Sequence, residues 1–379
     1  MPKKNNAINA MKNIETYDFL RFIVEELPMP LFVTDINDKI LLANSFARAL
    51  MGDDIIGKNA NEFLYSLADK KKVNEKVQNR IETGKEIDTY TITLKNKETG
   101  NVFVAELFIH VAGNYKIVVF KDITKEAEAR KLVNYMETNL KRIQESLLPE
   151  ESKDFGCLEY SYFYLPYGMI GGDYFDIIKI EDKKLIGIMA DISGHFSPAA
   201  MVMAIVRTLF HSRKIAGKGR RFVKFIEFLD SYLLSLKNIS NYVSGLFCRI
   251  DLTEKKMHYI NAGHLPFILN EKVVYPAKSQ FPVGLKIPFE KKYREETIEL
   301  KKGDRLVFFT DGLLTLSKFR DKNSSEVIEE IKDLVLQFKH LSSKECLKKI
   351  TAELNLLNDI PSSLKNEDDL TISIIDIKE

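Results

Sequence analysis

The 379-residue sequence has few cysteines, no long apolar run and almost no net charge. Its three cysteines, Cys157, Cys248 and Cys346, are far apart and odd in number, which favours buried reduced thiols over disulfides or a zinc site. No stretch approaches the roughly 20 apolar residues of a membrane helix. The basic N-terminus also lacks the apolar segment of a signal peptide. These absences predict a cytoplasmic protein with no membrane partner.

An excess of one sign of charge is also missing. The 56 Lys and Arg residues nearly balance 54 Asp and Glu residues, for a net charge of +2. Because nucleic-acid binding needs a basic surface that this balance does not indicate, no nucleic-acid partner is expected. The length predicts two globular domains.

Residues 17–124 combine short strands with short helices. Strand-like segments occur at 31–35, 39–44, 87–94, 102–110 and 116–122. The first two are joined by a polar turn, and a Lys-rich helical segment separates them from the other three. This order predicts a compact α+β domain. Residues 1–16 before it are expected to be a flexible N-terminus.

Three segments of this region resemble a PAS sensor domain. ELPMPLFVTDINDKILLANSFARALMG resembles the opening hairpin and helix, IIGKNANEF the start of the next helix, and VVFKDITKEAEARK the exit into a linker. His110 lies on an expected strand, not on the helices where heme-binding PAS domains place their ligand, and no cysteine is present for a flavin adduct. The sequence therefore predicts a sensor without naming its ligand.

A segment without glycine, residues 125–148, is expected to be a helical linker between two domains. Its apolar residues recur at steps of four and three, at Ala129, Val133, Met136, Leu140, Ile143 and Leu147. This spacing is an a/d heptad seam. It is shorter than the repeat of about three to four heptads that identifies a coiled coil. Two interpretations stay open: a dimerising signalling helix, which we favour and which implies a homodimer, and an amphipathic helix packed on its own domain.

Residues 149–379 carry aspartates at the ends of apolar, strand-like segments. The motifs are GGDYFD at 171–176, DISGH at 191–195, DG at 311–312 and DD at 368–369. Singly, each is an ordinary turn signal. Several carboxylates at one sheet edge would repel one another unless divalent cations neutralised them. Oxygen-only ligands favour Mg²⁺ or Mn²⁺ over zinc.

The order of these motifs resembles the SpoIIE-type branch of the PPM (protein phosphatase 2C-like) family. Further matching segments are NAGHLP at 261–266, PVGL at 282–285 and the lead-in QESLLP at 144–149. The resemblance covers residues 147–379. It implies an αββα sandwich, in which two sheets are flanked by helices, with a centre for two divalent metal ions, Mn²⁺ or Mg²⁺, at one end.

The resemblance also implies metal ligands. Asp191 would bridge both ions, the main-chain carbonyl of Ile192 would join one of them, and Asp173 would act largely through water. Asp311 and Asp368 would complete the second site. Asp173, Asp191, Asp311 and Asp368 are therefore the expected catalytic residues.

Two further aspartates have alternative roles. Asp369 is the alternate metal ligand if the alignment of the last motif is shifted by one residue. Asp176 either supports the ligands from outside or is structural, and the sequence leaves both possibilities open.

Two metal ions would activate water, so no protein nucleophile is needed. Ser193 and His195 are interpreted as a turn that begins a helix at 198–210, and His264 as a structural turn residue. Phe196 stands where the family motif usually continues with glycine, which predicts strain if that position requires positive φ.

The resemblance implies a metal-dependent protein serine/threonine phosphatase. Relatives with this architecture dephosphorylate a STAS-domain anti-sigma-factor antagonist in a partner-switching pathway, and we expect a phosphorylated partner of that kind here. The alternative is a catalytically weak pseudophosphatase that binds a phosphoprotein. A nucleotide cyclase, suggested by the likeness of GGDYF to GGDEF, is disfavoured because Tyr174 replaces an acidic residue.

Overall fold

The computed structural model describes residues 21–64, 90–194, 197–212, 222–356 and 368–379. The chain divides into two compact units, Met1–Asn134 and Tyr135–Glu379. This division falls inside the linker helix, so the domain limits expected from the sequence stay a prediction. The expected flexible N-terminus lies outside the described residues. None of the helices in the described part of the chain combines the length and apolar character that a membrane crossing requires.

The first unit is built on one antiparallel sheet. Its strands are β1 (Leu31–Asp35), β2 (Ile40–Ala43), β3 (Tyr90–Lys95), β4 (Val102–Ala112) and β5 (Tyr115–Asp122), in the order β2-β1-β5-β4-β3. Helix α2 (Ser45–Met51) and the 3₁₀ helix η1 (Ala60–Phe63) contribute buried residues to the same core as the sheet. The strands expected from the sequence are thus present, except that residues 87–89 lie outside the described ranges.

Side-chain alternation decides which face of this sheet is buried. Phe32 on β1, Leu107 on β4 and Val118 on β5 lie in the core, with residues of α2. Because successive side chains of a strand point to opposite faces, their neighbours are more exposed. His110 on β4 is one of these exposed neighbours.

Helix α4 (Thr124–Leu147) is the expected linker. It begins where the Thr124 backbone N–H donates to Asp122 Oδ1 at 2.9 Å, and it ends two residues before Pro149. The apolar seam is largely exposed: Val133, Met136 and Ile143 are 51%, 56% and 55% accessible. No residue of the described ranges covers these apolar side chains, which form an exposed apolar face on the helix.

The second unit contains two antiparallel sheets. One has the order β14-β11-β10-β9-β8, from β8 (Tyr174–Glu181), β9 (Lys184–Ile192), β10 (Val243–Asp251), β11 (Lys256–Ala262) and β14 (Glu296–Glu299). The other has the order β13-β12-β15-β16-β7-β6, from β6 (Ser152–Asp154), β7 (Leu158–Leu165), β12 (Phe267–Leu269), β13 (Lys272–Val274), β15 (Arg305–Phe309) and β16 (Leu370–Ile377).

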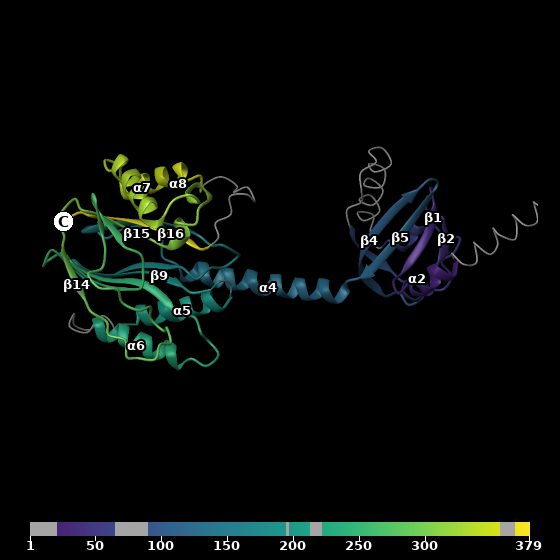
Figure 1. The fold of residues 1–379 in the computed structure, drawn as a ribbon, viewed down its shortest axis with the longest axis horizontal. Helices are drawn as coiled ribbons and strands as arrows, with labels where there is room; N and C mark the ends of the chain where they lie inside the picture. Colours follow the sequence, from purple (N-terminus) through teal and green to yellow (C-terminus); the bar gives the residue numbers. More distant parts are fainter. Residues whose placement is uncertain (1–20, 65–89, 195–196, 213–221, 357–367) are drawn as a thin grey trace, which may run out of the picture. The chain divides into compact units, whose positions relative to one another are not determined.

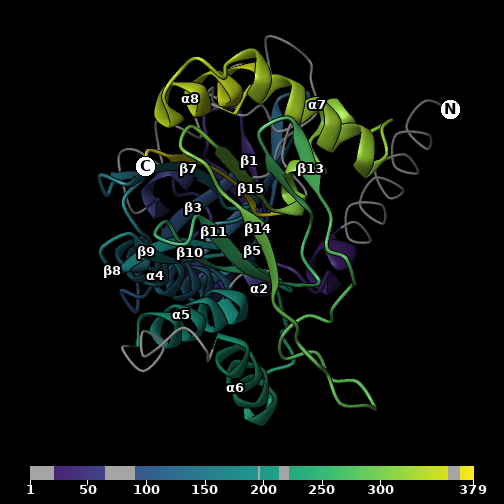
Figure 2. The same ribbon diagram turned by 90° about the vertical axis from the view of Figure 1, so that its left-hand side faces the viewer.

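Helices cover the outer face of each sheet. Helices α5 (Ser197–His211) and α6 (Phe222–Ser235) share a core with the β8–β11 sheet. Helices α7 (Ser324–Gln337) and α8 (Ser343–Glu353) share another with β15 and β16. Figures 1 and 2 show the resulting layers, helices–sheet–sheet–helices, which are the αββα sandwich expected from the sequence.

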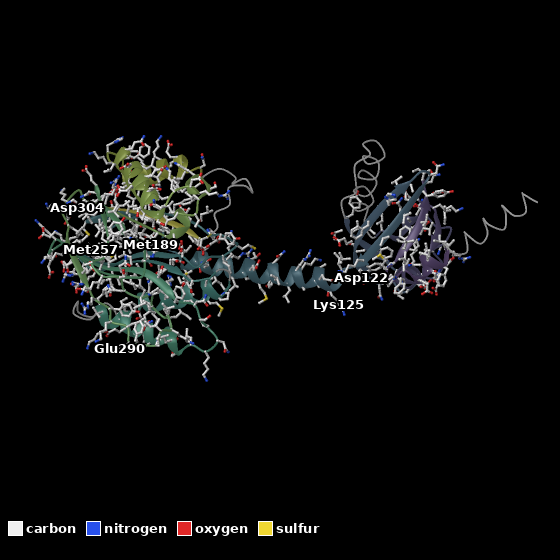
Figure 3. All side chains as sticks on the ribbon, in the orientation of Figure 1. Asp122, Lys125, Met189, Met257, Glu290 and Asp304 are labelled. Carbon is white, nitrogen blue, oxygen red and sulfur yellow. The ribbon has the colours of Figure 1, made fainter. Side chains whose placement is uncertain are left out.

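A third core fills the space between the two sheets. Met189 of β9 and Met257 of β11 belong to it and are labelled in Figure 3. Along β8, Phe175 and Ile177 enter this inner core, whereas Tyr174 packs on the helix side. The period-two pattern therefore fixes the direction of every side chain at the strand ends. The three cysteines are buried and free, as expected.

Candidate metal centre

Asp173 lies immediately before β8 and shares the inward direction of Phe175. It is 1% exposed, and its Oδ2 accepts hydrogen bonds from Thr310 Oγ1 at 2.7 Å and Thr371 Oγ1 at 2.6 Å. Its Oδ1 is buried and has no hydrogen-bond partner among the residues that the structure describes. A buried carboxylate oxygen without a partner is unfavourable, so this atom is suited to a water or a cation.

Thr310 and Thr371 join the second sheet to Asp173. The Thr310 N–H donates to the Thr371 carbonyl at 3.0 Å, and the Thr371 N–H donates to Thr310 Oγ1 at 2.8 Å. Sequence motifs alone assign neither threonine a role. The available signal is their inward position, two residues from Phe308 on β15 and four from Ile375 on β16.

Asp191 is the penultimate residue of β9 and also faces inward. Ser244 of β10 lies opposite it, and the Ser244 hydroxyl donates to Asp191 Oδ2 at 3.4 Å. Burial, and then the charges of Asp311, Asp368 and Asp369, raise the pKa of Asp191 to about 7. Similarly, burial and the charge of Asp191 raise the pKa of Asp173 well above its ordinary value. The carboxylates of distant motifs therefore act on one another.

Asp369 holds the loop that carries Asp173. Its Oδ1 accepts from the Tyr167 N–H at 2.7 Å, and its Oδ2 accepts from the Gly172 N–H at 2.5 Å. A Cβ on Gly171 would lie 2.3 Å from Asp369 Oδ1, so only glycine allows this approach. Both carboxylate oxygens of Asp369 thus bind the backbone.

The Ile192 carbonyl lies against the same loop. A Cβ on Gly172 would come within 2.8 Å of this oxygen, which shows how closely the end of β9 approaches the residue before Asp173. The Ile192 side chain is buried on the helix side. The structure therefore brings the expected carbonyl ligand next to the loop that carries Asp173.

Asp311 and Asp368 come from the ends of neighbouring strands. Asp311 begins the 3₁₀ helix η3 (Asp311–Leu313) after β15, and Asp368 precedes β16. Although Asp311 is exposed by its surface area, desolvation by neighbouring atoms and the charge of Asp368 raise its pKa. The Asp369 N–H donates to Asp368 Oδ1 at 2.8 Å.

Within the described residues, no group of three or more His, Cys, Asp or Glu side chains is already closed around a metal-sized space. The donor chemistry nevertheless fits hard divalent cations, since the donors are all oxygens, repel one another and include the unpartnered Asp173 Oδ1. The individual ligand roles stay a prediction.

Asp176 belongs to a different cluster. It points to the helix side of β8, where its Oδ2 accepts from the Tyr174 hydroxyl at 2.8 Å and lies 2.6 Å from His211 Nε2. His211 is the last residue of α5. These contacts support the structural alternative for Asp176, because they attach α5 to β8.

The Ser193 hydroxyl is engaged in loop structure. It accepts from the Tyr242 N–H at 2.8 Å, and the Ser193 N–H donates to the Tyr242 carbonyl at 2.9 Å. The helix expected at 198–210 is α5. His195 and Phe196 lie outside the described residues, so the hypothesis about Phe196 stays a prediction.

His264 lies beside Ser244, the residue that binds Asp191. Its backbone N–H donates to Asn261 Oδ1 at 2.8 Å, and its Nδ1 lies 3.3 Å from Ser244 Oγ. Burial of the ring lowers the pKa of His264 to about 4, so the imidazole is neutral near pH 7. A neutral ring beside Ser244 orients that hydroxyl and adds no charge.

Gln144 of α4 reaches the Asp173 loop from the linker helix. It is 5% exposed, and its Nε2 donates to the Gly171 carbonyl at 2.6 Å while its Oε1 accepts from the Gly171 N–H at 3.3 Å. The lead-in motif places Gln144 before the domain but does not indicate this contact. Residue spacing within the helix could not have predicted a contact with Gly171, which is 27 residues away in the sequence.

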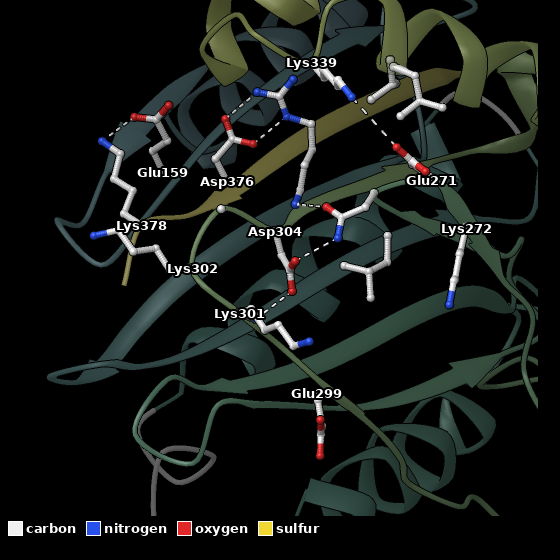
Figure 4. A pocket seen from close by; sticks show the side chains of 16 residues that line it. Glu159, Glu271, Lys272, Glu299, Lys301, Lys302, Asp304, Lys339, Asp376 and Lys378 are labelled. Atoms are coloured by element: carbon white, nitrogen blue, oxygen red, sulfur yellow. Dashed lines mark hydrogen bonds and ion pairs between the residues drawn. The ribbon is translucent and has the colours of Figure 1, made fainter.

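A cleft of about 940 Å³ (Figure 4) is lined by Asp304 and Arg305 at the start of β15, whereas Asp311 follows the end of that strand. Its lining charges include ion pairs such as Arg305 with Asp376 at 2.6 Å and Lys378 with Glu159 at 2.6 Å. None of the expected metal ligands lines it. Cleft size therefore does not identify the chemical centre of this unit.

Comparison with known proteins identifies the family of the second unit. The sequence model of the family "Stage II sporulation protein E (SpoIIE)" matches residues 181–378. Phosphoserine phosphatase RsbU of Bacillus subtilis is 25% identical over 62% of this chain and 67% of its own length. Phosphoserine phosphatase RsbP of the same organism is 25% identical over 40% of this chain and only 38% of its own length.

A solved structure shows the same fold. The SiaA-PP2C domain of Pseudomonas aeruginosa superposes with a TM-score of 0.53 at 16% identity, covering 66% of this chain and 99% of that domain. Since the family match spans residues 181–378 of 379, it includes more than half of the chain. The protein therefore belongs to the SpoIIE family, and its second unit is a phosphatase domain of the PP2C type.

Proposed function

We propose that the chain is a metal-dependent serine/threonine phosphatase that acts on a phosphorylated protein, with two divalent cations, Mg²⁺ or Mn²⁺, in the carboxylate centre. The observation that carries the proposal is the buried Asp173 Oδ1, which has no partner in the described part of the chain. Burial, and then the charges of Asp191 and Asp369, raise the pKa of the Asp173 carboxyl group. A divalent cation would supply the missing partner and offset the repulsion.

Each residue has a distinct task in this proposal. Asp191, Asp311 and Asp368 hold the cations, with the Ile192 carbonyl as a further oxygen ligand and Asp173 as a ligand largely through water. When bound, the cations lower the pKa of a water and offset charge on the phosphoryl oxygens.

The remaining groups of the centre position these ligands. Thr310 and Thr371 orient Asp173, and Ser244 orients Asp191. Asp369 is assigned to positioning the loop and not to metal binding, because both of its oxygens already accept backbone N–H groups.

The proposed substrate is a phosphoserine or phosphothreonine on a STAS-domain anti-sigma-factor antagonist. The names of RsbU and RsbP, both phosphoserine phosphatases, support the phosphorylated residue. The STAS-domain partner and the resulting change in sigma-factor use rest on the family resemblance of the motifs.

Regulation by the first unit, as a PAS sensor, is the second part of the proposal. The five-stranded order β2-β1-β5-β4-β3 and the motif order in residues 17–124 support it. Helix α4 links this unit to Gln144, which holds Gly171 of the Asp173 loop. The exposed seam at Val133, Met136 and Ile143 supports pairing of α4 with a second copy of the chain.

Hydrolysis of p-nitrophenyl phosphate by the full chain, with and without Mn²⁺, tests the enzyme proposal. Activity should require both the metal and Asp191, so Asp191→Ala should abolish it. Asp182→Ala, at an exposed turn between β8 and β9, is the matched control and should remain active. Metal binding without hydrolysis would instead favour the pseudophosphatase alternative.

A phosphorylated STAS-domain protein tests the substrate separately. Dephosphorylation of this protein much faster than of an unrelated phosphoserine protein is expected. Equal rates would contradict the assigned partner and leave the phosphatase activity unaffected.

A further inference from the structure

The core of the first unit contains a cavity of about 50 Å³. Apolar side chains make most of its wall, among them Phe32, Ile92, Leu107 and Val118. Four polar residues interrupt this wall: Thr34 and Lys116 on the sheet, and Asp38 and Asn61 outside it. A polar pair at inward positions of an apolar sheet face is unusual, because such groups lose their hydration on burial.

Thr34 and Lys116 lie directly opposite each other on β1 and β5. Their side chains therefore project to the same face of the sheet as neighbours. Thr34 is 1% exposed, and its Oγ1 is buried with no hydrogen-bond partner among the described residues. The hydroxyl lines the cavity, so it is free to bind a molecule there.

Lys116 is 7% exposed and forms an ion pair with Asp38, with Nζ 2.7 Å from Oδ1. Within the described ranges Asp38 is the one partner of this ammonium group, so two of its three N–H donors remain for another acceptor. The other oxygen of Asp38 accepts from Asn61 Nδ2 at 3.1 Å. Asp38 is thereby bound through both oxygens, and its side chain is 27% exposed compared with 8% for Lys116.

This difference in exposure indicates which sign of charge a ligand of the cavity should carry. Water screens the charge of Asp38 more than that of Lys116, since Lys116 is more deeply buried. The cavity thus presents an incompletely neutralised ammonium group and a free hydroxyl beside apolar walls. An anion with an apolar end matches all three features.

We propose that this cavity binds a short-chain monocarboxylate of the size of acetate, whose carboxylate accepts hydrogen bonds from Thr34 Oγ1 and Lys116 Nζ. Its methyl end packs against Ile92, Leu107 and Val118. A volume of about 50 Å³ admits about three to five non-hydrogen atoms, judged from the space that one buried water needs. The ligand would be an input of the first unit, and its binding does not depend on the phosphatase proposal.

Equilibrium dialysis of radiolabelled acetate against the full chain tests this site. Saturable binding of one acetate per chain is expected. Thr34→Val keeps the shape of the side chain and removes the hydroxyl, so the dissociation constant should rise at least about tenfold. The matched control is Thr91→Val on β3, where the side chain is exposed; it should bind acetate like the unchanged chain.

Lys116→Met should abolish binding, whereas Lys121→Met on the same strand should not. Lys121 also pairs with a carboxylate, Glu126 at 3.2 Å, but its side chain is 64% exposed. If the Lys116→Met variant does not fold, the Thr34→Val variant still tests acetate binding. The Thr34→Val variant should fold, because it removes only a buried hydroxyl that has no partner among the described residues.

Competition experiments define the ligand class. Unlabelled propionate should displace acetate, and acetamide, which has the same shape without the charge, should not. Nitrate should compete much more weakly because it has no apolar end. Absence of saturable binding, equal competition by acetamide or nitrate, or unchanged binding in Thr34→Val would overturn the proposal.

Discussion

Gln144 and Gly171 are joined by both halves of one side-chain amide. The Gln144 Nε2 donates to the Gly171 carbonyl at 2.6 Å, and its Oε1 accepts from the Gly171 N–H at 3.3 Å. Gly171 lies two residues before Asp173, whose carboxylate binds the second sheet through Thr310 and Thr371. A change in α4 therefore has a short covalent and hydrogen-bonded route to the proposed metal centre.

Gln144→Ala should weaken metal binding and lower stability. The Gly171 N–H and carbonyl would lose their partner, which costs about 1–3 kcal/mol when the groups stay buried. The loosened loop should then require several-fold more Mn²⁺ for half-maximal activity. Glu145→Ala, the exposed neighbour on α4, is the control, and the same Mn²⁺ midpoint in both variants would contradict the role of Gln144.

Asp191 should make the metal-free chain less stable as pH rises. Its folded pKa, about 7, lies above its ordinary value of 3.8, so the folded state binds this proton more tightly than the unfolded state does. The contribution is most favourable below pH 4 and is lost as pH rises through 7, by on the order of 4 kcal/mol.

Chemical unfolding at several pH values, with a chelator present, measures this effect. Asp191→Asn should reduce the slope between pH 4 and 7, leaving the part due to the raised pKa values of Asp173, Asp311 and Asp369. Asp182→Asn at an exposed turn should leave the slope unchanged. Saturating Mn²⁺ should also remove the loss of stability near pH 7. An equal pH slope in Asp191→Asn and in the unchanged chain would show that Asp191 is not the coupled group.

Asp176→Asn should affect stability but not metal affinity. Asp176 binds Tyr174 and His211 on the helix side of β8, and loss of its charge weakens both contacts, by about 1–3 kcal/mol. The comparison is Asp173→Asn, for which we expect a large loss of Mn²⁺ affinity. Urea unfolding and Mn²⁺ titration of both variants measure this, and a comparable loss of Mn²⁺ affinity in Asp176→Asn would contradict the structural role.

Gly171→Ala should disrupt the centre by steric overlap. The new Cβ would lie 2.3 Å from Asp369 Oδ1 and 2.4 Å from the Tyr164 hydroxyl, so the loop must move, at about 1–3 kcal/mol or more. Gly156→Ala is the control, because no atom lies within 4 Å of its Cβ and its positive φ of 85° adds only about 1 kcal/mol of strain. Activity should be lost in Gly171→Ala alone; retained activity would show that the loop adapts.

Much of the second unit was predictable because strand geometry is periodic. Once β8 is recognised, Asp173 must share the direction of Phe175 and Ile177, while Asp176 must point the other way with Tyr174. The same rule sends Asp191 inward from β9. The order of the motifs along the chain added the family resemblance, and that resemblance implied that these aspartates meet at one end of a sandwich.

Contacts between distant segments could not be read from any local pattern. The partner of Gln144 is 27 residues away, and Thr310 is 137 residues from Asp173. Asp368 and Asp369 are adjacent in sequence, and local pattern does not distinguish their roles. The backbone N–H groups of Tyr167 and Gly172, which donate to Asp369, distinguish it as the residue that holds the loop.

The sequence by itself determined the two-unit organisation, the strands with their inward faces, and the family of the second unit, because periodicity and motif order are local properties. Only the tertiary structure decided which donor each carboxylate meets, and that Thr34 and Lys116 face one another across β1 and β5. Those pairings depend on strand register and on loop packing, which are settled by long-range contacts once the chain has folded.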